Sequence, residues 1–213
     1  MVEINRATDR GIDSMDIEIL SDKAAFCSTD LLRPINAEVL STTMQQTKLN
    51  SKLIAEYSAQ IKAKPITDQL HNLSAVSVKL ISGSDFEPVW DQLVRYYHYL
   101  GYQNLIGHRL KYLALIEDQP VAALSWSAPA LKLAARDQYI GWSPTQRKRH
   151  INQLACNSRF LILPWIKIAN LASHVLSLNI AQLKNDWQQH FNKQLLMLET
   201  FVDSRYFKGT CYK

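Results

Sequence analysis

A carboxylate near the end of the chain is the first candidate for chemistry. Glu199 lies within the apolar stretch 195–202. Apolar surroundings raise the pKa of a carboxyl group, which would suit Glu199 to act as a general acid or base. An isolated buried charge is costly, so a buried ion pair with Arg136 or Arg159 is the alternative interpretation. Both interpretations stay open from the sequence.

Two aspartates are further catalytic candidates. Asp203 lies four residues after Glu199, which on a strand places both on one face, about 13 Å apart. That separation is too large for the two carboxylates to share a metal ion or a proton. Asp137 stands between Arg136 and the expected strand residues Tyr139-Ile140. It allows the same two interpretations as Glu199, catalysis or an ion pair.

Consecutive basic residues suggest contact with nucleic acid. Arg147, Lys148, Arg149 and His150 follow one another, and Arg136 is nearby in the sequence. The formal net charge is +5, from 24 Lys and Arg against 19 Asp and Glu. A cluster of this kind can bind phosphates, and Arg136, Arg147, Lys148 and Arg149 are its candidates. The alternative is an ordinary solvated helix face.

The start of a long helix after residue 169 is a candidate anion site. Asn170 is a favourable N-cap residue, and Ser173 falls in the first turn. Free N–H groups and the helix dipole at such a position attract phosphate. Residues 165–169 contain no glycine, so the backbone could not approach a ligand closely. The alternative is a capped helix without a ligand.

The sequence contains no motif for a metal site and no signal for a membrane span. No Cys-x-x-Cys or His-Glu-x-x-His motif is present, so we expect no metal site. The three scattered cysteines, Cys27, Cys156 and Cys211, fit free thiols in a reducing compartment. No apolar run approaches the roughly 20 residues that span a bilayer, and the first residues lack a signal-peptide core. We expect a cytoplasmic protein without membrane contact.

The elements that would position these residues follow from periodicity and turn signals. Residues 1–70 are expected to form a mostly helical appendage, with an apolar stripe at Leu49, Leu53, Tyr57 and Ile61. Residues 66–75 look like a polar connection. Ser143, Pro144 and Gln146 predict a capping box. The expected elements of the second domain, 76–213, are strand 76–81, helix 86–100, strands 110–116 and 121–126, helix 144–150, strand 160–163, helix 171–187 and strand 195–202.

This order predicts an α/β (α+β) fold with a mixed sheet flanked by helices. It is also the order of Gcn5-related N-acetyltransferases up to their fifth main strand. That resemblance implies a coenzyme A-type cofactor at the helix that Asn170 begins. The glycine-rich turn that holds the cofactor in those enzymes is absent here, and topology alone is weak evidence for function.

Seven unusual sequence words stand in the second domain: His98-Tyr99-Leu100-Gly101, residues 135–142 (ARDQYIGW), 157–165 (NSRFLILPW), 170–173 (NLAS), Asp186-Trp187, 199–203 (ETFVD) and 209–212 (GTCY). In this order they resemble the DruA family. That family occurs in the Druantia anti-phage system and beside or fused to transposases. The resemblance runs from about residue 76 to the C-terminus and implies a role in defence against foreign DNA or in mobile elements, without a known reaction.

The chain departs from the family pattern at its end. The pattern continues beyond Gly-Thr-Cys-Tyr with a further segment, whereas this sequence stops at Lys213. The expected strand 195–202 is strongly apolar, and an uncovered apolar sheet edge invites pairing with another chain. We therefore expect a truncated member of the family that is marginally stable or completes its sheet by self-association.

The leading hypothesis is a DruA-like component of a phage-defence or transposon-associated system that acts on or near DNA. One alternative is an acyltransferase-like enzyme in which Asn170 and Glu199 flank the site. The other is a non-catalytic subunit that recruits a helicase-like, nuclease or transposase partner. The sequence leaves open whether the protein is an enzyme.

Overall fold

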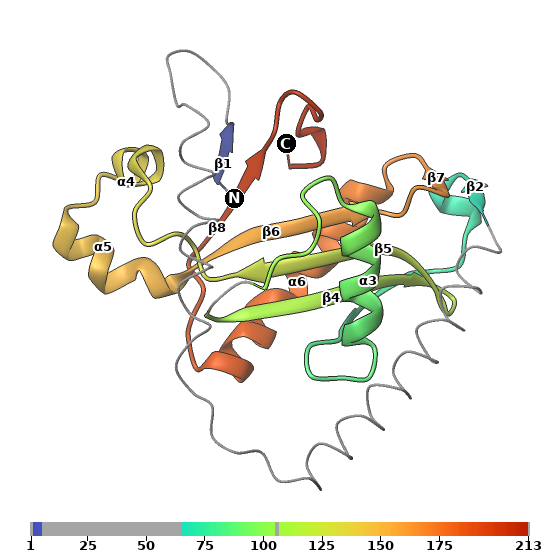
Figure 1. Ribbon diagram of the computed structural model, residues 1–213, viewed down its shortest axis with the longest axis horizontal. Coiled ribbons are helices and arrows are strands. Elements are labelled where there is room, and N and C mark those ends of the chain that lie inside the picture. The colour runs from blue at the N-terminus through green and yellow to red at the C-terminus, as the bar shows by residue number, and fades with distance from the viewer. Residues whose placement is uncertain (1, 6–64, 105–106, 213) are drawn as a thin grey trace, which may run out of the picture.

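The computed structural model describes residues 2–5, 65–104 and 107–212. Its centre is a mixed sheet with the strand order β1-β8-β6-β5-β4-β3 (Figure 1). In chain order, the first four strands of this sheet are β1 (Val2–Asn5), β3 (Val76–Leu80), β4 (Arg109–Ile116) and β5 (Gln119–Ser127). They are followed by β6 (Leu154–Ile162) and β8 (Met197–Val202).

The pairing of neighbouring strands changes once across the sheet, from antiparallel to parallel. Neighbouring strands from β3 to β6 run antiparallel, whereas β6, β8 and β1 run parallel. The predicted mixed sheet is therefore confirmed. The hairpin of β4 and β5 is also confirmed, and its turn is tight: Glu117 adopts a left-handed backbone with φ 55°. Apart from their first residues, both strands are buried throughout, as expected for strands covered on both faces.

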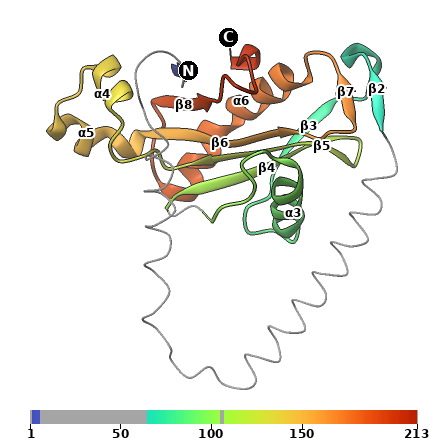
Figure 2. The ribbon, with the colours of Figure 1, turned by 45° about the horizontal axis from the view of Figure 1, so that its top comes forward.

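Two helices cover the two faces of the sheet (Figure 2). On one face lies α3 (Glu87–Tyr97), whose Trp90 donates its Nε1–H to the carbonyl of Leu124 at 3.0 Å. On the other lies α6 (Leu171–Phe191), whose Asp186 accepts a hydrogen bond from the Tyr112 hydroxyl at 3.0 Å. Both helices were predicted from apolar periodicity, but α3 ends at Tyr97 rather than at residue 100, and α6 continues to Phe191 rather than ending at 187. The fold is thus α+β, with its core between the sheet and these two helices.

A small helical arm connects β5 to β6 and stands away from the sheet (Figure 1). It consists of α4 (Ala134–Ile140) and α5 (Pro144–His150). The predicted capping box is confirmed: Ser143 Oγ accepts from Gln146 N–H, and the Gln146 side chain accepts from Ser143 N–H. The prediction of a strand at Tyr139-Ile140 was wrong. Those residues end α4, and Gly141 closes it with φ 77°, a conformation that glycine adopts without strain.

Other boundaries also differ from the prediction. The strand expected at 160–163 begins six residues earlier, at Leu154. The connection expected at 66–75 contains β2 (Ile66–Asp68), which pairs in parallel with β7 (Ile166–Ile168). The apolar stripe expected to form a helix at 49–61 lies outside the described residues.

The last strand is not the sheet edge that the sequence predicted. β8 pairs with β6 on one side and with β1 on the other, Val2 facing Glu199. The edge argument for self-association therefore does not apply to β8. Its pairing partner comes from the other end of the chain, which no local pattern could indicate. Within the described residues, no helix is both long and apolar enough to cross a membrane.

The contact between the sheet and α6 includes a buried polar pair. Trp126 on β5 and Asn179 on α6 are fully buried, and Trp126 Nε1 donates to Asn179 Oδ1 at 2.6 Å. Asn179 Nδ2 is also buried and has no hydrogen-bond partner. The Trp126 indole N–H is therefore the donor that the structure provides for the side-chain oxygen of Asn179.

We expect Trp126→Phe to lower the free energy of unfolding by about 1–3 kcal/mol, because it leaves the buried Asn179 amide without its donor. Replacing both partners with apolar groups, as in Trp126→Phe/Asn179→Leu, should recover most of that loss. Urea denaturation followed by circular dichroism measures both changes. A double variant that is no more stable than Trp126→Phe would contradict this account of the pair.

Candidate functional site

Buried polar side chains cross the sheet face that α3 covers. Lys111 on β4 pairs in register with Ser125 on β5, which pairs with Arg159 on β6. All three are less than one tenth exposed. A bulge after Ser125 brings Ser158 to the same face, with its Oγ 2.9 Å from Ser125 Oγ. Buried polar residues of this kind require partners, and the two cations differ in theirs.

Lys111 is neutralised by α3. Its Nζ lies 2.8 Å from Glu87 Oε1 and contacts Asp91 Oδ1. It also lies over the rings of Trp90 and Tyr102, 5.0 and 5.3 Å from their centroids. Two carboxylates and two aromatic faces offset the cost of burying this ammonium group. Lys111 therefore docks α3 on the sheet.

Arg159 is a buried cation held by neutral oxygens. Its Nε donates to the Gly101 carbonyl at 2.9 Å, one terminal nitrogen to the Ser158 carbonyl at 2.6 Å, and the other to Gln103 Oε1 at 3.5 Å. Within the described residues no carboxylate forms an ion pair with it, and burial lowers its pKa. Arg159 thus fixes the backbone that follows α3.

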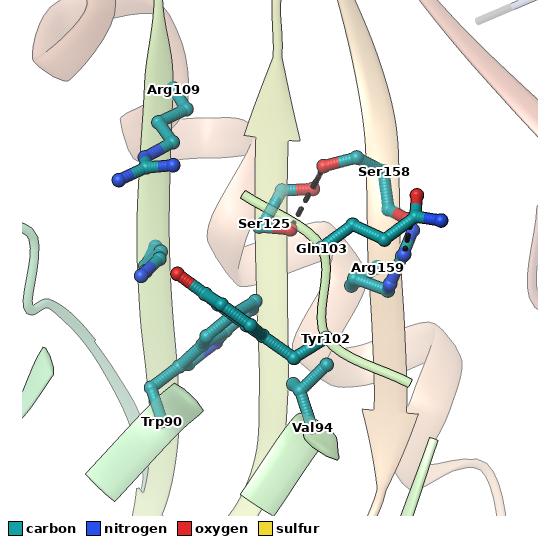
Figure 3. A pocket seen from close by; sticks show the side chains of 9 residues that line it. Trp90, Val94, Tyr102, Gln103, Arg109, Ser125, Ser158 and Arg159 are labelled. Atoms are coloured by element: carbon teal, nitrogen blue, oxygen red, sulfur yellow. Dashed lines mark hydrogen bonds between the residues drawn. The ribbon is translucent and has the colours of Figure 1, made fainter. Parts of the chain in front are cut away.

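Arg159, Lys111 and Ser125 line a small hollow beneath Tyr102 and Gln103 (Figure 3). It encloses only about 10 Å³, room for roughly one water molecule. A wider groove of about 590 Å³ runs beside β2, between Pro65 and Gln119. Its lining contains Asp68 and Glu117 but no Lys, Arg or His, so it does not suit an anion. Neither space has the size and charge of a coenzyme A site.

A second row of polar residues ends in a buried ion pair. Ser127 pairs in register with Cys156, and Cys156 with Glu199. Arg136, from α4, reaches Glu199 with its terminal nitrogen 3.4 Å from both carboxylate oxygens. Each of these two charged side chains is 1% exposed. Of the two interpretations of Glu199, the structure contains the ion pair with Arg136.

The ion pair continues to the arm surface. Arg136 Nε and its second terminal nitrogen donate to Asp137 Oδ1, both at 3.2 Å. Arg147 on α5 donates to Asp137 Oδ2 at 2.8 Å. Glu199, Arg136, Asp137 and Arg147 therefore form a chain of alternating charge from β8 through α4 to α5. We call it the arm anchor.

The protonation states follow from these contacts. Burial raises the pKa of Glu199, while the Arg136 guanidinium opposes that rise. Burial also disfavours ionisation of Asp137, but hydrogen bonds from Arg147 and Arg136 hold its pKa below the usual value. Burial, followed by the Glu199 charge, raises the pKa of Cys156 to about 12. The Cys156 thiol is thus neutral near pH 7 and a poor nucleophile.

The predicted phosphate-binding residues divide into two groups. Lys148 and Arg149 on α5 are exposed. Arg147 is bound to Asp137, and Arg136 is buried in the arm anchor. The position of Arg136 does not suit contact with a phosphate backbone. Ser143 caps the first turn of α5, and Lys148 and Arg149 lie in its last turn.

The predicted anion site at α6 differs in geometry from the expectation. Asn170 occupies the N-cap position, but its backbone is left-handed with φ 61° and its side chain makes no capping hydrogen bond. The prediction of a side-chain cap was wrong. Ser173 is exposed. Nothing in this arrangement adds a ligand contact to the helix N-terminus.

Asp203 lies just beyond β8 and away from the Glu199 pair. Its carboxylate accepts from Arg205 Nε at 2.9 Å and from a terminal nitrogen of the same guanidinium at 2.7 Å. The two carboxylates, Glu199 and Asp203, therefore have separate cationic partners. Within the described residues, no group of three or more His, Cys, Asp and Glu side chains could hold a metal ion.

The turn that follows α3 was not among the predicted site residues. His98 Nδ1 accepts from Leu100 N–H at 3.1 Å, and its ring stacks on Tyr99 with centroids 4.8 Å apart. Burial, with a contribution from the Arg159 charge, lowers the pKa of His98 to about 4. His98 is thus neutral near pH 7 and its proton is on Nε2. The word His98-Tyr99-Leu100-Gly101 was the signal that could have identified this turn.

Glu199→Gln should lower the free energy of unfolding by about 3 kcal/mol, because it removes the buried carboxylate facing Arg136. The control Glu117→Gln, in the exposed β4–β5 turn, should change it by less than about 0.5 kcal/mol. Denaturant unfolding of both variants measures the difference. Equal stability of Glu199→Gln and wild type would show that the pair does not hold the arm.

The His98 pKa predicts a pH dependence. The unfolded chain binds a proton at His98 near pH 6.5 and the folded chain only near pH 4. Its contribution to stability is thus full above pH 6.5 and is lost as the pH falls toward 4. His98→Asn keeps an acceptor for Leu100 and should flatten stability between about pH 6.5 and 5, where carboxylates stay ionised. An unchanged slope in unfolding measurements would contradict the assignment.

Comparison with known proteins identifies the family. The family model for the Druantia protein DruA matches residues 30–213, which is most of the chain. The match begins well before residue 76, where the resemblance in the sequence analysis started. No curated protein and no solved structure matches the chain, so the likeness to Gcn5-related acyltransferases stays a prediction. The chain belongs to the DruA family of Druantia proteins.

Proposed function

We propose that this DruA protein acts on DNA in anti-phage defence, and that α5 contacts the phosphate backbone. Family membership indicates a component of a Druantia anti-phage system. The observation that carries the DNA proposal is the position of two cations on the arm. Lys148 and Arg149 are exposed on a helix that stands away from the sheet (Figure 1).

The arm anchor supports this proposal because it fixes the direction of α5. Arg147 uses its charge to bind Asp137, so it holds the helix. Within the described residues, no carboxylate forms an ion pair with Lys148 or Arg149. Phosphate is a strong partner for such exposed cations, and their contacts would be independent of DNA sequence.

The acyltransferase alternative has no comparable support. Glu199 is bound to Arg136, Asn170 does not cap α6, and the hollow beside Arg159 has room for about one water molecule. We therefore do not extend the proposal to acyl transfer. A subunit that only recruits a helicase-like, nuclease or transposase partner is the competing function, and DNA binding distinguishes it.

Replacing Lys148 and Arg149 by Gln should weaken binding to duplex DNA of any sequence. Each lost phosphate contact reduces the slope of log affinity against log salt by roughly 0.9, so the double variant should lose about two. Fluorescence anisotropy across a salt series measures both quantities. The matched control Lys184→Gln/Lys193→Gln removes two exposed cations, one in α6 and one just after it, and should keep the wild-type slope.

Two results would contradict the proposal. If the wild-type chain binds no DNA at low salt, the recruiting subunit becomes the better hypothesis. If it binds DNA and the Lys148→Gln/Arg149→Gln variant keeps the full slope, then α5 is not the contact. Circular dichroism of each variant checks that its fold is intact.

A further inference from the structure

Three aromatic side chains gather on the surface from two distant segments. Tyr99 follows α3, whereas Tyr206 and Phe207 follow β8; they are 45%, 65% and 51% exposed. The Tyr99 ring centroid lies 5.6 Å from that of Tyr206 and 5.2 Å from that of Phe207. Leu100, 53% exposed, adjoins Tyr99 in the chain. We call Tyr99, Tyr206 and Phe207 the aromatic patch. Single exposed apolar residues are common, but a contiguous cluster marks an interaction site.

Both segments of the patch are held in place. Tyr99 rests on the buried His98 ring, and Arg159 fixes the end of this turn through the Gly101 carbonyl. On the other segment, the backbone N–H groups of Tyr206 and Phe207 both donate to the Asp203 carbonyl, at 3.0 and 2.9 Å. The rings are therefore presented by ordered backbone, which lowers the entropic cost of binding a partner.

Two cationic side chains border the patch, Arg205 in an ion pair with Asp203, and Lys208. Arg205 is 74% exposed and lies over the Tyr206 ring, 5.6 Å from its centroid. Lys208 follows Phe207 and is also exposed. Asp203 is the one acidic residue between residues 200 and 212, and it forms an ion pair with Arg205. Aromatic faces beside cations are the combination that binds single-stranded nucleic acid, through base stacking and backbone attraction.

We propose that the aromatic patch stacks unpaired bases of single-stranded DNA. This proposal rests on the proposed function, because it assumes that the protein binds DNA. It adds a second surface and names the form of DNA that this surface binds. In a duplex the bases are stacked on one another and their faces are inaccessible, whereas an unpaired base can lie on an aromatic ring. The α5 cations contact phosphates of either form. The patch adds a preference for unpaired DNA.

The size of the patch favours bases over a protein partner. A stable protein interface buries about 800 Å² on each side. A whole aromatic side chain buries only about 150–250 Å², so three half-exposed rings provide well under that area. Each ring is, however, large enough for a base, and stacking contributes about 1–3 kcal/mol per base, or roughly 5- to 150-fold in affinity.

The experiment compares full-length variants on a short oligothymidylate and on a duplex of equal length. Tyr206→Ala and Phe207→Ala should each weaken single-strand binding about tenfold, which corresponds to one lost stacking contact. Their duplex affinity and salt slope should not change. Phe207→Tyr keeps the ring and should bind as wild type. The control Tyr96→Ala removes a tyrosine that is 71% exposed on α3, outside the patch.

A second measurement reports stacking directly. A 2-aminopurine base in the oligonucleotide changes fluorescence when it stacks on an aromatic ring, which a purely ionic contact would not cause. The change should occur with wild type and disappear with Tyr206→Ala. Because the exposed rings carry little of the fold, the variants should unfold at the wild-type denaturant midpoint.

The failures of the two proposals are distinguishable. Loss of the salt slope in the α5 variant, with unchanged single-strand affinity in the patch variants, would overturn the patch alone. Tenfold loss in the patch variants, with no effect of the α5 variant, would overturn α5 and retain the patch. Patch variants that keep full single-strand affinity but lose binding to a purified helicase-like partner would assign this surface to protein and overturn the proposal.

Discussion

The arrangement of the surface depends on one buried ion pair, Arg136 with Glu199. Neither side chain can be left alone at 1% exposure, because an unpaired buried charge costs several kcal/mol. Glu199 is fixed in the sheet by pairing of β8 with β6 and β1. Arg136 must therefore bring α4 to the sheet, and Asp137 and Arg147 extend the constraint to α5. The ion pairs of the interior thus hold the helix that carries Lys148 and Arg149.

The second buried arginine has the same positioning role without a carboxylate partner among the described residues. The N–H groups of Arg159 donate to carbonyl and amide oxygens, two of which belong to the segment 101–103. This segment has no helix or strand hydrogen bonds of its own, so the guanidinium supplies the constraint that regular structure would otherwise provide. The turn that carries Tyr99 is ordered as a consequence. Two interior cations thus position two separate surfaces.

Local patterns predicted the elements whose signals are local. Helix α3, the β4–β5 hairpin and the capping box of α5 could be read from spacing. Helix α4 could not, because the side chain that it buries is Arg136, whose partner lies 63 residues away. For the same reason the sequence left open whether Glu199 is paired. It also could not predict that Tyr99 lies beside Tyr206. Long-range contacts decided each of these cases.

The buried titratable groups on the α3-covered sheet face are poorly placed for proton transfer. A catalytic acid or base requires a pKa near the working pH and access to its substrate. Glu199 is shielded and held by Arg136, the Cys156 thiol is protonated with a pKa of about 12, and Lys111 is held by two carboxylates. Glu199 and Lys111 are thus held in ion pairs, and the Cys156 thiol is neutral near pH 7. Their shared effect is to fix backbone and helices, which places the groups able to meet a ligand, Lys148, Arg149 and the aromatic patch, at the surface.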